Sequence, residues 1–133
     1  MLKNLYRYLA TLVFFFFIDL VWIQFVANRL YNEYVSDILI TNPRALPAII
    51  FYILHALVLV TVTQLSSSNS IWRKTLIASL IGLTAYATYN LTNYSIIESW
   101  HQNLLLPDII WGAVLSGSSI LFANYIVKEK RDV

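Results

Sequence analysis

Five polar side chains interrupt the strongly apolar segments of this sequence and are the first candidates for chemistry: Asp19, His55, Asn90, Asn93 and Asp108. Ionisable groups at membrane depth are expensive and usually face a bundle interior or a cavity. An ionised Asp near a helix centre costs about 2.5–3.5 kcal/mol, whereas one interhelical hydrogen bond contributes about 0.6 kcal/mol. We therefore expect a function for the two carboxylates, which would form a proton-linked pair if they face one cavity. The asparagines are more simply explained by a structural role, in which their side chains form hydrogen bonds between helices.

Most other catalytic and cofactor chemistry lacks the residues it needs. The chain contains no cysteine, which excludes thiol–disulfide chemistry and thiolate metal sites. It has no serine–histidine–carboxylate motif, glycine-rich phosphate loop or paired metal-ligand spacing. A metal held by Asp19, His55 and Asp108 has no spacing motif in its favour. Haem is disfavoured because His101 lies about 15 Å from His55 in depth. The sequence thus predicts no cofactor and no metal, and it leans against an enzyme.

The segments that must position these side chains are long and apolar. The chain of 133 residues is 59% hydrophobic and 12% charged, with a mean hydropathy of +0.65. Soluble domains carry about 25% charged residues. A membrane span needs about 20 mostly apolar residues, and four such stretches run over about 5–27, 45–65, 75–97 and 104–127. We predict an all-α integral membrane protein, a single domain over 1–133 with four transmembrane helices in a bundle.

Basic residues are distributed unequally between the two ends of this predicted bundle. Four spans place both termini on one side of the membrane. Seven of the nine basic residues then lie on that side, namely Lys3, Arg7, Arg73, Lys74, Lys128, Lys130 and Arg131. Only Arg29 and Arg44 lie opposite. The positive-inside rule makes the side with seven cytoplasmic. These charges indicate membrane orientation rather than binding to nucleic acid.

The connection over 28–44, on the predicted outer side, has an amphipathic pattern. One face is apolar (Leu30, Tyr31, Tyr34, Val35, Ile38 and Leu39), and the other is polar (Asn32, Glu33, Ser36 and Asp37). This spacing predicts a short helix that lies at the outer interface or extends the first span. A role in packing is the simpler interpretation, and a gating lid is the alternative.

The polar side chains are expected to lie in one layer of the membrane. At about 1.5 Å rise per residue, Asp19 and His55 lie about 20 and 18 Å above the inner boundary of a roughly 30 Å core. By the same count, Asn90 and Asp108 lie about 23 and 25 Å above it. Residues on the same helix faces complete the candidate ligand-binding cluster: Asp19, Trp22, His55, Tyr86, Asn90, Asn93, Asp108 and Trp111. For Trp22 and Trp111, anchoring at the interface is a simpler explanation than a ligand cage.

Three stretches of the sequence resemble a family of small bacterial membrane proteins, the domain-of-unknown-function family 2177. They are Asp19-Leu20-Val21-Trp22, the run over 85–93, and Asp108-Ile109-Ile110-Trp111-Gly112. The resemblance covers essentially the whole chain and implies a bacterial inner-membrane protein with no established activity. Asn90 stands where the family is expected to carry Asp, which weakens a metal or proton-relay site. His55 stands where a tyrosine is expected more often, which argues against an essential ligand.

These features allow three functions. The first is binding or moving a small polar molecule or lipid headgroup in a buried site in the outer half of the bilayer, open to the outer face. Transport would require a homodimer, because four helices are too few to enclose a wide pore. The second is a membrane-embedded accessory subunit of a larger membrane complex, whose polar and small-residue faces, such as Gly112 and Ser116, pack against partner helices. The third is a lipid-modifying enzyme with Asp19 or Asp108 as general acid or base.

Overall fold

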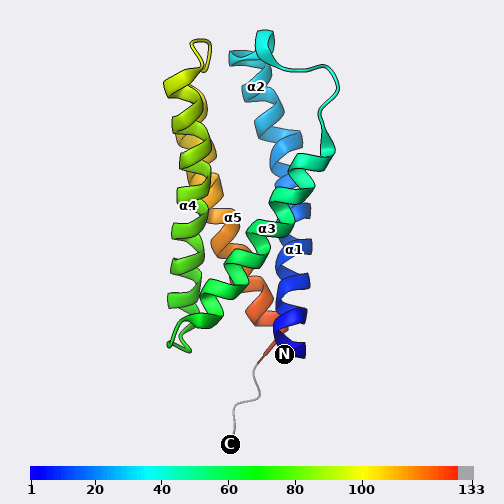
Figure 1. The fold of residues 1–133 in the computed structure, drawn as a ribbon, viewed down its shortest axis with the longest axis vertical. Helices are drawn as coiled ribbons and strands as arrows, with labels where there is room; N and C mark the ends of the chain where they lie inside the picture. The colour runs from blue at the N-terminus through cyan, green and yellow to red at the C-terminus, as the bar shows by residue number, and fades with distance from the viewer. Residues whose placement is uncertain (129–133) are drawn as a thin grey trace, which may run out of the picture.

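The computed structural model describes residues 1–128, and its helices account for 84% of them, with no strand in that range. Lys130 and Arg131, which contribute to the predicted charge bias, lie outside the described residues. The helical elements follow one another along the chain in Figure 1: α1 (Leu2–Trp22), the π-helical turn η1 (Ile23–Ala27), α2 (Asn28–Tyr34), the 3₁₀ turn η2 (Ser36–Ile38), α3 (Ala45–Leu65), α4 (Ile71–Ile96), the 3₁₀ turn η3 (Gln102–Leu104) and α5 (Leu105–Ile126).

The first helical segment is longer than the sequence predicted. The elements α1, η1 and α2 run without a break over Leu2–Tyr34, which is 33 residues and about 50 Å of helix. The segment ends where Val35 leaves the helical region with φ −138°, and residues 39–44 contain no helix. Pro43 restricts the residue before it to an extended conformation. The amphipathic connection is therefore an extension of α1 as far as Tyr34, and the predicted span end at 27 is too early.

The all-α membrane fold predicted from the sequence is confirmed. Within residues 1–128, three helical segments are long and apolar enough to cross a membrane: Leu2–Tyr34, Ala45–Leu65 and Gln102–Ile126. α4 is equally long, with 26 residues, but its composition is more polar. The hydroxyls of Thr84 and Thr88 donate to carbonyl oxygens one turn earlier in α4, at 2.9 and 2.7 Å. These bonds satisfy the hydroxyls within their own helix, so α4 can join three apolar helices as the fourth member of the bundle.

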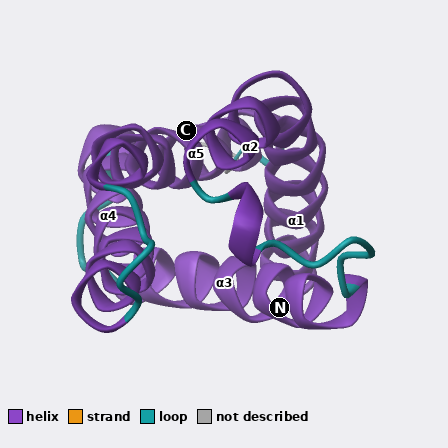
Figure 2. Ribbon diagram, turned by 90° about the horizontal axis from the view of Figure 1, so that it is seen from above, coloured by secondary structure: helices purple, strands orange, loops and turns teal. Residues whose placement is uncertain are grey.

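Each helix of the bundle has two main neighbours. Seen from above in Figure 2, α1 and α4 lie on opposite sides, and α5 and α3 lie between them. α4 and α5 form the most extensive interface. Their backbones approach closely at Gly82 and Gly112, where an added Cβ on Gly82 would lie 2.1 Å from the Gly112 carbonyl oxygen. The main core contains Phe15, Tyr52, Leu59, Val60, Ala78, Leu115 and Ile120.

The direction of α3 leaves one side of the bundle partly open. In Figure 1, α3 starts beside the α1–α2 segment and crosses diagonally to the foot of α4. We call the end where α1 begins, α3 and α4 meet and α5 finishes the base of the bundle. The opposite end, which carries α2 and η3, is the distal end. Because α3 and α4 meet at the base, they diverge toward the distal end.

Candidate functional site

Asp19 is the centre of a hydrogen-bond network that joins three helices. Its side chain is 6% exposed. One carboxylate oxygen, Oδ2, accepts a hydrogen bond from the hydroxyl of Tyr52 on α3 at 2.5 Å. The other, Oδ1, accepts from the indole Nε1 of Trp111 on α5 at 2.9 Å. Each oxygen of this buried carboxylate thus has a donor, which is what a buried charged or polar group requires.

The two tryptophans of the predicted cluster form one stacked pair. The rings of Trp22 and Trp111 lie with centroids 4.5 Å apart and planes at 5°. Trp111 also donates to Asp19, so its indole belongs to the interior network. The indole N–H of Trp111 thus points toward Asp19 on the neighbouring helix, and anchoring of Trp111 at the membrane interface stays a prediction. The Nε1 of Trp22 is buried and makes no hydrogen bond within residues 1–128.

A second carboxylate, Asp108, is held by Asn90. The amide Nδ2 of Asn90 donates to Asp108 Oδ2 at 2.5 Å and to the carbonyl oxygen of Tyr86 at 3.0 Å. Asn90 is completely buried, and its Oδ1 has no partner among the described residues. The carboxylates of Asp19 and Asp108 lie close enough to interact electrostatically, and Tyr86 lies within range of both. Four helices therefore contribute to one buried polar layer.

His55 adds the third polar contact, one helical turn along α3 from Tyr52. Its Nε2 lies 2.9 Å from Ser116 Oγ of α5 in a buried hydrogen bond. The imidazole stacks on Phe51 at a centroid distance of 5.0 Å and meets the edge of Phe15 at 5.2 Å. Its other nitrogen, Nδ1, makes no hydrogen bond to any described residue. His55 thus keeps one position available for a ligand.

Two members of the predicted cluster take little part in these bonds. Asn93 is half-buried, and its side chain makes no hydrogen bond within residues 1–128. Tyr86 packs its ring against the backbone of Gly112, where an added Cβ would lie 2.3 Å from the ring. Tyr86 therefore fills space beside the carboxylates, and its hydroxyl has no partner in the described part of the chain.

A groove opens beside His55 on the side of the bundle that faces the lipid. Its volume is about 630 Å³. Its walls come from α3 (Phe51, Leu54, His55 and Val58) and from α4 (Ile77, Leu80, Ile81, Thr84 and Ala85). Leu54 and Leu80 are each 55% exposed, so the groove is lateral. Most of its wall is apolar, and the two helices that form it, α3 and α4, diverge toward the distal end in Figure 1.

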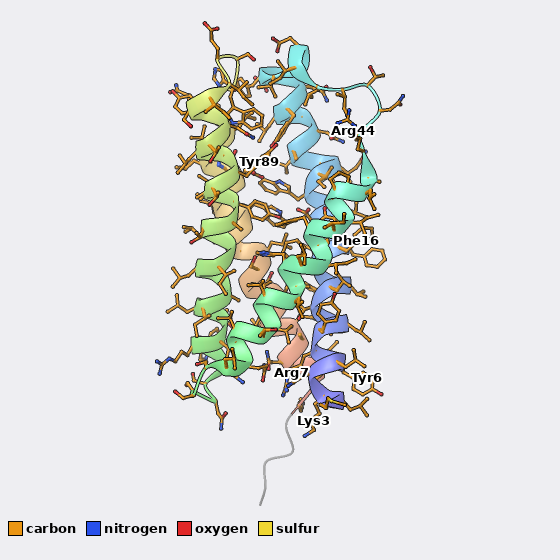
Figure 3. All side chains as sticks on the ribbon, viewed as in Figure 1. Lys3, Tyr6, Arg7, Phe16, Arg44 and Tyr89 are labelled. Carbon is orange, nitrogen blue, oxygen red and sulfur yellow. The ribbon has the colours of Figure 1, made fainter. Side chains whose placement is uncertain are left out.

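The distal end of the bundle is covered by a separate apolar cluster. Val35, Trp100 and Leu104 are its buried residues. The ring of Trp100 meets the edges of Tyr31 and Tyr89 at 5.7 and 5.6 Å, and Figure 3 shows Tyr89 on α4 toward this end. α2 and the loop before α5 therefore pack together over this end of the bundle. The described groove opens laterally instead.

Sequence reasoning missed two partners in the polar layer, Tyr52 and Ser116. Tyr52 precedes His55 by three residues, so both lie on the same face of α3. A tyrosine hydroxyl at membrane depth needs a partner, and this was the available signal. Nothing in the sequence assigns Ser116 to His55, because that pairing depends on how α3 crosses α5. Among residues 1–128, no three side chains of His, Cys, Asp or Glu converge closely enough to hold a metal ion.

Taken together, the apolar helices and the shared polar layer define the class: an all-α membrane protein that crosses the bilayer several times and buries the carboxylate of Asp19 between its helices. Within that class, the chain belongs to the family described as predicted membrane protein (DUF2177), whose model matches residues 4–125. The resemblance found in the sequence is thereby confirmed. Neither a search of curated proteins nor a search of solved structures found a match.

Proposed function

We propose that this membrane protein binds an amphiphilic molecule, with the polar headgroup at the buried polar layer and the apolar part in the groove between α3 and α4. The observation that carries the proposal is that His55 contacts both the groove and the polar layer. It lines the groove, and it also bonds Ser116 beside the layer that contains Asp19. A molecule that enters from the lipid can therefore keep its chain in the groove while its headgroup reaches polar partners.

The composition of the polar layer favours a headgroup that carries hydrogen-bond donors or a positive charge. Two carboxylates, Asp19 and Asp108, are acceptors when ionised. Asn90 Oδ1 is a further buried acceptor, and it has no partner among residues 1–128. Buried polar atoms in folded proteins nearly always have a partner, so a bound headgroup or water would supply the missing donor. A primary amine with several N–H groups meets this requirement better than a purely anionic group.

Entry from the lipid is also better supported than entry from water. Apart from His55 and Thr84, the groove is lined by apolar residues. Its volume of about 630 Å³ falls in the range of about 300–1,000 Å³ that small-molecule sites occupy. The cluster around Trp100 covers the distal end of the bundle. An amphiphile is therefore a better fit than a freely soluble polar metabolite.

The proposal can be tested by thermal unfolding of the purified protein in detergent with added lipids. The probes are phosphatidylethanolamine, whose headgroup has N–H donors, phosphatidylcholine, whose headgroup has none, and phosphoethanolamine without chains. We expect stabilisation by phosphatidylethanolamine alone, about 2.7 kcal/mol when the lipid is present at 100 times its Kd. Thr84→Phe should abolish this stabilisation, because the new ring occupies the groove.

The matched control is Leu83→Phe, which adds a ring at the neighbouring position. Leu83 is 41% exposed and does not line the groove, so this variant should respond to lipid as the wild type does. Equal stabilisation by all lipids, or an unchanged response in Thr84→Phe, would contradict binding in the groove. Stabilisation by phosphoethanolamine alone would indicate a soluble ligand instead.

We further propose that the protein lies in a bacterial inner membrane with the base of the bundle in the cytoplasm. Support comes from the charges at the base, where Arg7, Lys74 and Lys128 line one hollow, and from the positive-inside rule. Alkaline phosphatase, which is active only outside the cytoplasm, should be inactive when fused before Met1 and active when inserted in the loop over 39–44. The reverse pattern would overturn this orientation.

A further inference from the structure

A second hollow lies at the base of the bundle, at the opposite end from the distal cluster. It has a volume of about 510 Å³. Its lining comes from α1, the segment that leads into α4, α4 itself and the end of α5: Arg7, Asn69, Ile71, Lys74, Leu121, Asn124, Tyr125, Val127 and Lys128. Figure 3 shows Arg7 at this end, close to Lys3 and Tyr6. Among the described residues, nine line the hollow, and three of these are cationic and none is acidic.

Lys74 is the most unusual residue of this hollow. Its side chain is only 6% exposed, although lysine is almost never fully buried without a partner. Its Nζ has one weak contact, 3.5 Å from Gln64 Oε1, and no ion pair within residues 1–128. Removing an ammonium from water costs several kcal/mol unless an anion or good hydrogen bonds compensate. Within residues 1–128, no anion therefore balances the charge of the Lys74 ammonium.

The surroundings of Lys74 add positive potential. Arg7, whose guanidinium donates to Asn4 Oδ1 at 2.9 Å, is 4% exposed and lines the same hollow. Lys128 lies over the ring of Tyr125 at 5.2 Å. α4 begins at Ile71, and no side chain in the described part of the chain caps its first N–H groups. A helix N-terminus carries about half a positive charge, so the start of this 26-residue helix strengthens the attraction for an anion.

We propose that this hollow binds a phosphate group, carried either by an anionic lipid headgroup or by a soluble phosphate compound. Phosphate matches the ammonium groups of Lys74 and Lys128, because its oxygens accept charge-assisted hydrogen bonds from such groups. Asn69 and Asn124 supply neutral donors in the same lining. Basic pockets between helices at the cytoplasmic surface are typical binding sites for anionic headgroups. The site is separate from the amphiphile site and does not depend on it.

The test uses the full-length protein in detergent and measures binding by native mass spectrometry and thermal unfolding. The probes are phosphatidylglycerol, phosphatidylcholine and inorganic phosphate. We expect phosphatidylglycerol or inorganic phosphate to bind with an affinity that Lys74→Gln lowers about tenfold or more, the loss of at least one hydrogen bond to a charged group. Binding should also weaken as salt is added, because ions screen the attraction.

Arg73→Gln is the matched control, because Arg73 is the exposed neighbour of Lys74 and lies outside the lining. This variant also removes one positive charge. Its affinity for the phosphate probe should stay within about twofold of the wild-type affinity, as expected for a screened surface cation. If Lys74→Gln does not fold, Lys128→Gln replaces it. Equal losses in the pocket and control variants would overturn the proposal, as would the failure of all phosphate probes to bind better than phosphatidylcholine. Preference for phosphatidylglycerol over inorganic phosphate would identify a lipid source, and the opposite preference a soluble one.

Discussion

Asp19→Leu is expected to lower the free energy of unfolding by about 2–4 kcal/mol. The reason is that the Tyr52 hydroxyl and the Trp111 indole N–H both lose their acceptor, and an unsatisfied buried donor costs about 1–3 kcal/mol. Insertion of an ionised Asp into the membrane also costs free energy. That cost is the same in the folded bundle and in the unfolded state, in which the helices are separated. It therefore does not offset the loss. Reversible unfolding in mixed micelles measures the effect.

Asp19→Asn separates the structural role of this residue from a role in binding. Asparagine keeps one acceptor oxygen and adds an amide that can donate to the Tyr52 hydroxyl. We expect its stability to lie within about 1 kcal/mol of the wild type, the scale of a single hydrogen bond. Binding of phosphatidylethanolamine should be lost, because the negative charge is gone. Retained binding would contradict a role for the carboxylate in the ligand site, and a wild-type stability for Asp19→Leu would contradict the network.

Gly82→Ala is expected to destabilise the interface between α4 and α5 by about 3 kcal/mol, at the upper end of the range for overpacking. The new Cβ would lie 2.1 Å from the Gly112 carbonyl oxygen, which is backbone and cannot rotate away. The two helices must then separate where their contact is closest. Thermal unfolding in detergent measures the loss of stability, and a cross-link between cysteines introduced on α4 and α5 measures the separation.

Gly117→Ala provides the comparison, because it makes the same chemical change on α5. Its Cβ would meet the Oγ of Ser79 at 2.2 Å, and the next atom lies 3.4 Å away. A serine hydroxyl can rotate to another rotamer, so we expect a cost below about 1 kcal/mol. If both alanine variants were equally stable, backbone contact at Gly82 would not be what holds the two helices together.

The extent of the helices could be read from the sequence with few errors. The predicted span over 45–65 coincides with α3, Ala45–Leu65, and α4 and α5 begin and end within a few residues of their predictions. Hydrophobic length is a local property, because a span needs about 20 apolar residues wherever it packs. The continuation of α1 to Tyr34 was harder to predict. No glycine or proline stands between residues 5 and 42 to mark a boundary.

The membership of the polar layer was predicted only in part. Asp19, Asn90 and Asp108 could be assigned to one layer by counting residues along each helix. The contacts of Trp111 and Tyr52 with Asp19 could not be assigned in this way. Counting gives a height along the helix but no rotation about its axis.

By itself, the sequence determined the all-α membrane class, the family, the lengths of the helices and the approximate level of the buried polar groups. The tertiary structure alone decided which side chains meet, that the distal end is covered, and that a groove opens between α3 and α4. The physical reason lies in the apolar helices. α3 is apolar on all sides over most of its length, so its composition favours no single face for the interior. Its rotation and crossing direction follow from close packing at particular side chains, and this information exists only when the helices are together.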